Sequence, residues 1–163
     1  AGIFEEALEH LRAAAELEPD DPTVHGELGT ALALKGDLEA AMREFETALE
    51  LAPDDAWTRV ITGLIYAELG DLEEAAETLI QAAEELEGDA EAHILAGLAA
   101  AAVGWDDAAQ DALARAEYSV EGTDVALLEE AEARVLSGQK AARTLLLETV
   151  GPSALRERLS QPL

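Results

Sequence analysis

The stretch HGELGTALALKGDLEAAMREFETALELAPDD, from His25 to Asp55, decides how this chain folds. Small residues and leucines alternate in it at regular places, and Pro53 stands near its end. On each side of Gly36, apolar residues recur at the three- and four-residue steps of one helix face. A left-handed glycine commonly ends a helix, and the Asp37 that follows can cap the next one. The stretch therefore predicts two helices joined by a tight turn at Gly36.

The same arrangement recurs along the chain at an interval of 34 residues, a period typical of repeat folds. The matching columns are Gly29, Gly63 and Gly97; Gly36, Gly70 and Gly104; Ala41, Ala75 and Ala109; Phe45, Leu79 and Leu113; and Ala48, Ala82 and Ala116. A glycine inside a helix costs about 1 kcal/mol relative to alanine, so the first column needs a compensating reason. We expect close helix crossings there, each filled by one large side chain.

This pattern resembles the tetratricopeptide repeat family. The match is fullest over residues 22–55 and looser over 56–89 and 90–123, where Glu87 replaces the usual proline and His93 takes an aromatic position. The resemblance implies an all-α fold, a right-handed superhelix of stacked helix-turn-helix repeats. It also implies that the first helix of each repeat lines a concave groove, and that the protein binds peptides or protein segments.

The whole of residues 1–163 is expected to form a single repeat domain. Its expected segments are the second helix of a partial repeat at 1–21, repeats at 22–55, 56–89 and 90–123, a degenerate repeat at 124–150 and a C-terminal capping segment at 151–163. Because the chain begins in mid-repeat without a methionine, we expect a helix or another domain to precede it.

The net charge of −26, from 36 acidic and 10 basic residues, limits the partners of this protein. Nucleic acids and anionic membrane surfaces require clustered lysine and arginine, so neither is expected as a partner. No apolar run has the length of a membrane span, and we expect a cytoplasmic protein. Adaptation to high salt and simple solubilisation of the outer helix faces are alternative explanations of the acidity.

No residue pattern indicates catalysis, a metal site or a cofactor, so the chain is not expected to be an enzyme. The candidates considered are His10, His25 and His93 and the pairs Asp20–Asp21, Asp54–Asp55 and Asp106–Asp107. His25 and His93 occupy the same repeat position, which favours a packing role over acid–base or zinc chemistry. The aspartate pairs lack calcium-loop spacing, and helix capping explains most of them.

An apolar stripe in the first helices of two repeats is the candidate binding site. A surface helix normally has one apolar face, yet here a second one lies beside the residues expected in the core. The predicted groove residues are Trp57, Val60, Leu64, Ile94, Leu98 and Ala101. We expect Leu64 to lie in a solvated groove until a ligand binds, with Trp57 as the main anchor.

The apolar stripe predicts a protein-interaction module that binds an apolar peptide or an amphipathic helix in its groove. The alternative is a structural or self-assembling scaffold. In that case the groove is closed by the chain's own C-terminal tail, where Leu155 and Leu159 lie one turn apart, or by a second copy in a homodimer. The expected partner is a protein or a peptide, and a homodimer is the alternative assembly.

Overall fold

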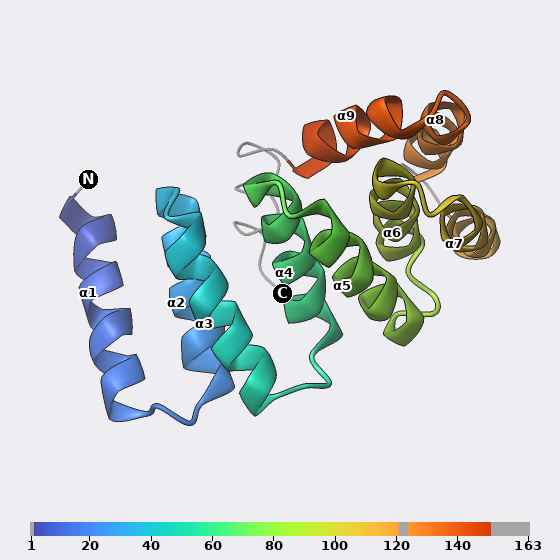
Figure 1. The fold of residues 1–163 in the computed structure, drawn as a ribbon. Helices are drawn as coiled ribbons and strands as arrows, with labels where there is room; N and C mark the ends of the chain where they lie inside the picture. The colour runs from blue at the N-terminus through green and yellow to red at the C-terminus, as the bar shows by residue number, and fades with distance from the viewer. Residues whose placement is uncertain (1, 121–123, 151–163) are drawn as a thin grey trace.

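The computed structural model describes residues 2–120 and 124–150, and within these residues every regular element is an α-helix (Figure 1). The helices are α1 (Gly2–Leu17), α2 (Pro22–Lys35), α3 (Leu38–Leu51), α4 (Ala56–Leu69), α5 (Leu72–Glu85), α6 (Ala90–Val103), α7 (Asp106–Ser119), α8 (Asp124–Leu136) and α9 (Gln139–Val150). The fold is the all-α superhelix of stacked helix pairs that the repeat predicted. The pairs α2–α3, α4–α5 and α6–α7 are each packed closely together.

The turns within these pairs are set by glycine. Gly36, Gly70 and Gly104 have φ angles of 93°, 96° and 84°, in the left-handed region that residues with a side chain rarely adopt. The backbone N–H of each glycine donates to carbonyls of the helix that it ends. At Asp37 the carboxylate then accepts from the Ala40 amide at 3.3 Å and caps α3. The predicted turn at Gly36 is therefore confirmed.

The glycines inside the first helices allow the two helices of a pair to approach closely, as predicted. A Cβ atom built on Gly63 would lie 2.7 Å from Leu79 Cγ, and one on Gly97 would lie 2.9 Å from Leu113 Cγ. One on Gly29 would lie 3.1 Å from the ring of Phe45. The large side chain expected at each crossing thus fills the space beside the glycine.

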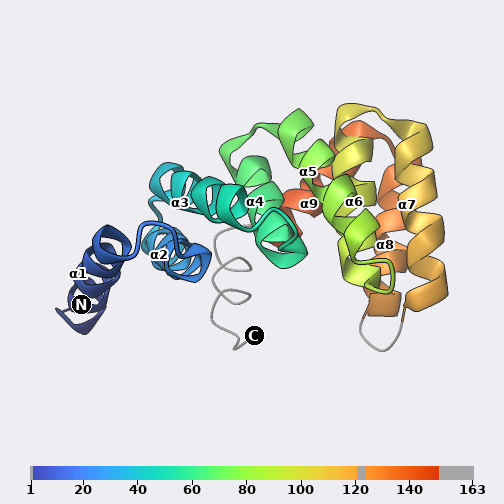
Figure 2. The same cartoon turned by 90° about the horizontal axis from the view of Figure 1, so that it is seen from below.

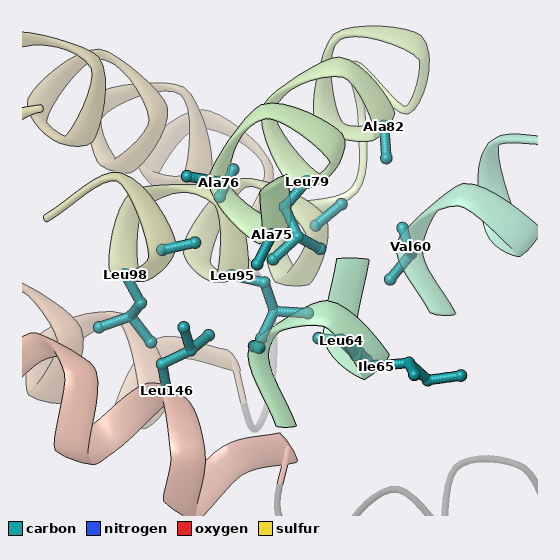
Figure 3. Packing of buried hydrophobic residues seen from close by; sticks show 14 of the residues in the cluster. Val60, Leu64, Ile65, Ala75, Ala76, Leu79, Ala82, Leu95, Leu98 and Leu146 are labelled. Atoms are coloured by element: carbon teal, nitrogen blue, oxygen red, sulfur yellow. The ribbon is translucent and has the colours of Figure 1, made fainter. Parts of the chain in front are cut away.

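The last helix does not extend the row of pairs. α9 turns back after α8 and packs mainly against α6, with further contacts to α4. Figure 2 shows α9 between α4 and α6 and not beyond α7. Its residues Ala142, Leu145 and Leu146 are buried, and Figure 3 shows Leu146 directed toward Leu98 of α6. α9 therefore covers the face that α4 and α6 turn away from α5 and α7.

Candidate functional site

The structure places the six predicted groove residues on α4 and α6. Trp57, in the first turn of α4, is 44% exposed, whereas the other five are each at most 3% exposed. These five are Val60, Leu64, Ile94, Leu98 and Ala101, and all belong to the main hydrophobic cluster. Leu64, at 1% exposed, does not lie in a solvated groove as expected. The reason is packing, since Leu64 belongs to the main hydrophobic cluster, to which α9 contributes by lying against α4 and α6.

α9 is amphipathic, and its orientation shows which kind of segment this face accommodates. Ala142, Leu145 and Leu146 are buried, while Arg143, Thr144 and Glu148 are exposed. One apolar stripe at three- and four-residue spacing therefore packs on the first helices, and the polar side faces outward. The face of α4 and α6 is occupied by a helix of the same chain. The tail residues Leu155 and Leu159 lie outside the described residues.

A shared position in α2, α4 and α6 connects each first helix to its surroundings. In α2, His25 Nδ1 lies 2.8 Å from Glu44 Oε2, and Nε2 lies 3.0 Å from the Pro19 carbonyl oxygen. The hydrogen bond to Glu44 raises the pKa of His25, although burial opposes the shift. In α4 the corresponding Arg59 donates to Glu85 and to the Pro53 carbonyl. These side chains connect the first helix of a pair to the second helix of that pair, and also to the turn that precedes the pair.

In α6 the same position holds His93, which is 2% exposed. Its Nδ1 lies 2.8 Å from the Asp89 carbonyl oxygen and donates to it, because a carbonyl can only accept. Among the described residues, Nε2 has no hydrogen-bond partner. Both His25 and His93 are packed in the interior, as predicted. They differ in that only His25 uses both ring nitrogens.

His93 lines a cavity of about 180 Å³ between α5, α6 and α7, which we call the convex cavity. Its other lining residues are Ile80, Ala83, Glu84, Ala96, Ala108, Asp111, Ala112 and Arg115. The apolar part of the wall consists of Ile80 and the four alanines, and the charged side chains of Glu84, Asp111 and Arg115 are exposed. The repeat pattern alone did not predict this cavity. The signal was three reductions in size at a distance of one repeat: Leu49 to Ala83, Glu74 to Ala108, and Thr78 to Ala112.

Helix capping explains fewer of the paired aspartates than expected, because Asp106 and Asp107 lie in the first turn of α7, whose N-cap residue is Trp105 and makes no side-chain capping bond. Asp21 and Asp55 cap α2 and α4 by accepting from backbone amides at 2.8 and 3.1 Å. Within residues 2–120 and 124–150, no group of three or more His, Cys, Asp or Glu side chains could hold a metal ion. In the same residues, no helix has the length and apolar character needed to cross a membrane.

Comparison with known proteins agrees with the repeat pattern. Two family profiles, both described as tetratricopeptide repeat, match residues 1–64 and 62–85, which together are just over half of the chain. The chain matches none of the curated proteins.

Several solved structures share the fold. MamA AMB-1 has a TM-score of 0.71 at 22% identity, and the match covers 98% of this chain and 90% of that one. MamA MSR-1 gives 0.68 at 22% identity, with 99% and 91% covered. MamA from Desulfovibrio magneticus RS-1 gives 0.66 at 24% identity, with 98% and 88% covered. At these identities the similarity concerns the fold alone.

Proposed function

The chain belongs to the tetratricopeptide repeat family, and from this premise we propose that it is a protein-interaction scaffold that docks an amphipathic helix on α4 and α6. Family and fold support an interaction or scaffold role in general, and both are typical of modules without enzymatic activity. The proposed docking face consists of Trp57, Val60, Leu64, Ile94, Leu98 and Ala101.

The position of α9 is the observation that carries this proposal. A helix with one apolar stripe already packs on α4 and α6, so the shape and chemistry of that face suit such a guest. A partner helix would take the place of α9, with the half-exposed Trp57 as a contact at the edge of the docking face.

Displacement of α9 sets the energetic condition for binding. Burying a leucine contributes about 1.5–3 kcal/mol, and α9 buries both Leu145 and Leu146. The closed arrangement is therefore strongly favoured in the free protein. The apparent affinity for a partner is reduced by the small fraction of molecules in which α9 has left. A partner must bury more apolar surface than α9, or α9 must be released by another event.

A synthetic peptide with the sequence of residues 139–150 tests this proposal on the full chain. In a Leu146→Glu variant, the carboxylate cannot be buried without a partner, so α9 should detach and leave the docking face open. The labelled peptide should then bind to this variant and not to the parent in fluorescence anisotropy. Leu136→Glu is the matched control, because Leu136 is 88% exposed and its replacement should leave the peptide unbound.

Two results would contradict the proposal. One is a Leu146→Glu variant that keeps its helical circular dichroism but does not bind the peptide. The other is a parent chain that binds the peptide as well as the variant does. A Leu146→Ala variant, which removes less packing, provides the same comparison if the glutamate variant unfolds.

A second candidate is a scaffold whose face stays permanently closed by its own chain, and the packing of α9 favours it over closure by a second copy. Light scattering separates these alternatives. A parent that is monomeric at all concentrations excludes the homodimer, and a Leu146→Glu variant that dimerises shows that the open face can pair with itself. A cytoplasmic location stays a prediction, which fractionation of the source cells would test.

A further inference from the structure

We propose that the convex cavity is a second protein-binding site, which receives one tyrosine side chain from a segment with basic flanking residues. It lies among α5, α6 and α7, whereas the proposed docking face lies on α4 and α6 under α9. The inference therefore does not depend on what displaces α9.

The first argument comes from the repeat position of His93. When the repeats are aligned, Ala112 occupies the position that Glu44 has in the repeat at 22–55, and Glu44 is the residue bonded to His25. Glu87 stands where the preceding repeat has Pro53, whose carbonyl accepts from Arg59. His93 has thus lost the carboxylate partner that His25 uses, whereas the backbone carbonyl at Glu87 is present but not bonded to it, and its one bond is to the Asp89 carbonyl.

The chemistry of the free nitrogen defines the ligand atom. Because Nδ1 carries the proton that Asp89 accepts, the neutral ring presents Nε2 as an acceptor. His93 is 2% exposed and lines the cavity, and its Nε2 keeps contact with solvent, because it is not a buried atom without a partner. A ligand ring that fills the cavity would exclude this solvent and would therefore have to supply a donor. A single neutral O–H donor satisfies it without placing a charge in an apolar space.

The walls define the rest of the ligand. Ile80 and four alanines surround the space, and the alanines Ala83, Ala108 and Ala112 replace larger residues of the preceding repeat. An apolar cavity of about 150 Å³ is known to hold a benzene ring, so about 180 Å³ has room for a phenol ring. Tyrosine joins this ring to one donor, and it is a frequent anchor in protein interfaces.

The charge around the cavity indicates the flanks of the bound segment. Glu84, Asp111 and Arg115 line it and are exposed, and Arg115 is paired with Asp111 at 3.0 Å, so these three side chains together carry one negative charge. The chain as a whole carries −26. Lysine or arginine next to the tyrosine would meet this negative field, which favours encounter with a basic segment.

A pair of short peptides, acetyl-Lys-Gly-Tyr-Gly-Lys-amide and its phenylalanine analogue, tests the proposal on the full chain. The tyrosine peptide should bind about tenfold tighter or more, because the phenylalanine ring would cover Nε2 without supplying a donor. His93→Phe should remove this preference for the hydroxyl. Calorimetry gives both affinities, and the His93 ring signals in NMR should shift with the tyrosine peptide.

Ala112→Leu provides a test that leaves His93 in place. The larger side chain fills the cavity and should abolish binding of the tyrosine peptide. The matched control is Ala114→Leu, the same change at an exposed position of the same helix, which should bind as the parent does. Equal affinity for the two peptides, binding to neither, or full binding by Ala112→Leu would overturn the proposal.

Discussion

At the scale of single residues, two helix glycines should respond in opposite ways to an added methyl group. In Gly63→Ala the new Cβ would lie 2.7 Å from Leu79 Cγ, and Leu79 is fully buried and has no room to move. Overpacking of this kind costs about 1–3 kcal/mol. In Gly26→Ala no atom lies within 4 Å of the new Cβ, so the better helix propensity should stabilise by about 1 kcal/mol.

Urea unfolding of the two variants beside the parent measures this difference. The midpoint should fall for Gly63→Ala and rise for Gly26→Ala. Equal shifts in the same direction would show that close helix approach is not the reason for the glycine at position 63.

A second residue-scale prediction concerns the pH dependence of the His25–Glu44 pair. The bond to Glu44 raises the pKa of His25 in the folded protein, so folding favours the protonated ring. The stabilisation is therefore fully present below the ordinary histidine pKa of about 6.5 and is lost as the pH rises through the raised value. Glu44→Gln should lower the free energy of unfolding at pH 6 and have little effect at pH 9.

The difference between parent and Glu44→Gln is the quantity to measure, since titration of the other groups then cancels. Urea unfolding at several pH values provides it. A destabilisation that stays constant from pH 6 to pH 9 would contradict a charged His25 as its origin.

At the scale of helices, most of what the sequence predicted comes from the repeat columns. Gly63 and Gly97 each stand opposite the expected large residue, and Gly36 ends a helix, because each position repeats the same local geometry. α9 could not be predicted in this way. Its segment lacks the regular alanine columns, and its contacts with α4 join parts of the chain that are far apart in sequence.

The candidate site shows the same limit. Periodicity predicted an apolar stripe on α4 and α6, but it cannot tell what packs against a stripe. The structure adds α9 as the covering element. The convex cavity was also missed, because it results from the small size of Ala83, Ala108 and Ala112 on two separate helices. Because alanine is common in helices, its presence at these positions does not by itself predict a cavity.

The cover provided by α9 leads to a prediction for α4. Leu64 is 1% exposed, so Leu64→Glu buries a carboxylate without a partner and should destabilise by roughly 3 kcal/mol or more. Trp57→Ala removes a side chain that is 44% exposed, and its effect should be much smaller. Thermal unfolding followed by circular dichroism compares the two. A Leu64→Glu protein as stable as Trp57→Ala would mean that Leu64 is not packed in the interior.

At the scale of the whole molecule, negative charge acts against the compact fold. The chain carries −26, and two of the ion pairs that the described residues form, Arg115–Asp111 and Arg134–Glu130, are exposed and each lie within a single helix. Exposed pairs of this kind contribute about 0–1 kcal/mol each. Attraction between them cannot balance the repulsion among the remaining carboxylates, which stacking of the repeats brings closer together.

Added salt should therefore stabilise the protein. The screening length falls from about 30 Å at 0.01 M to about 8 Å at 0.15 M, so repulsion between neighbouring repeats weakens mainly in this range. We expect the melting temperature to rise from 10 mM to 1 M sodium chloride, with most of the increase below about 0.2 M. A rise confined to the highest concentrations would indicate general exclusion of salt from the protein surface and not screening. A flat or falling series would show that the acidic residues only keep the outer helix faces soluble, without straining the fold.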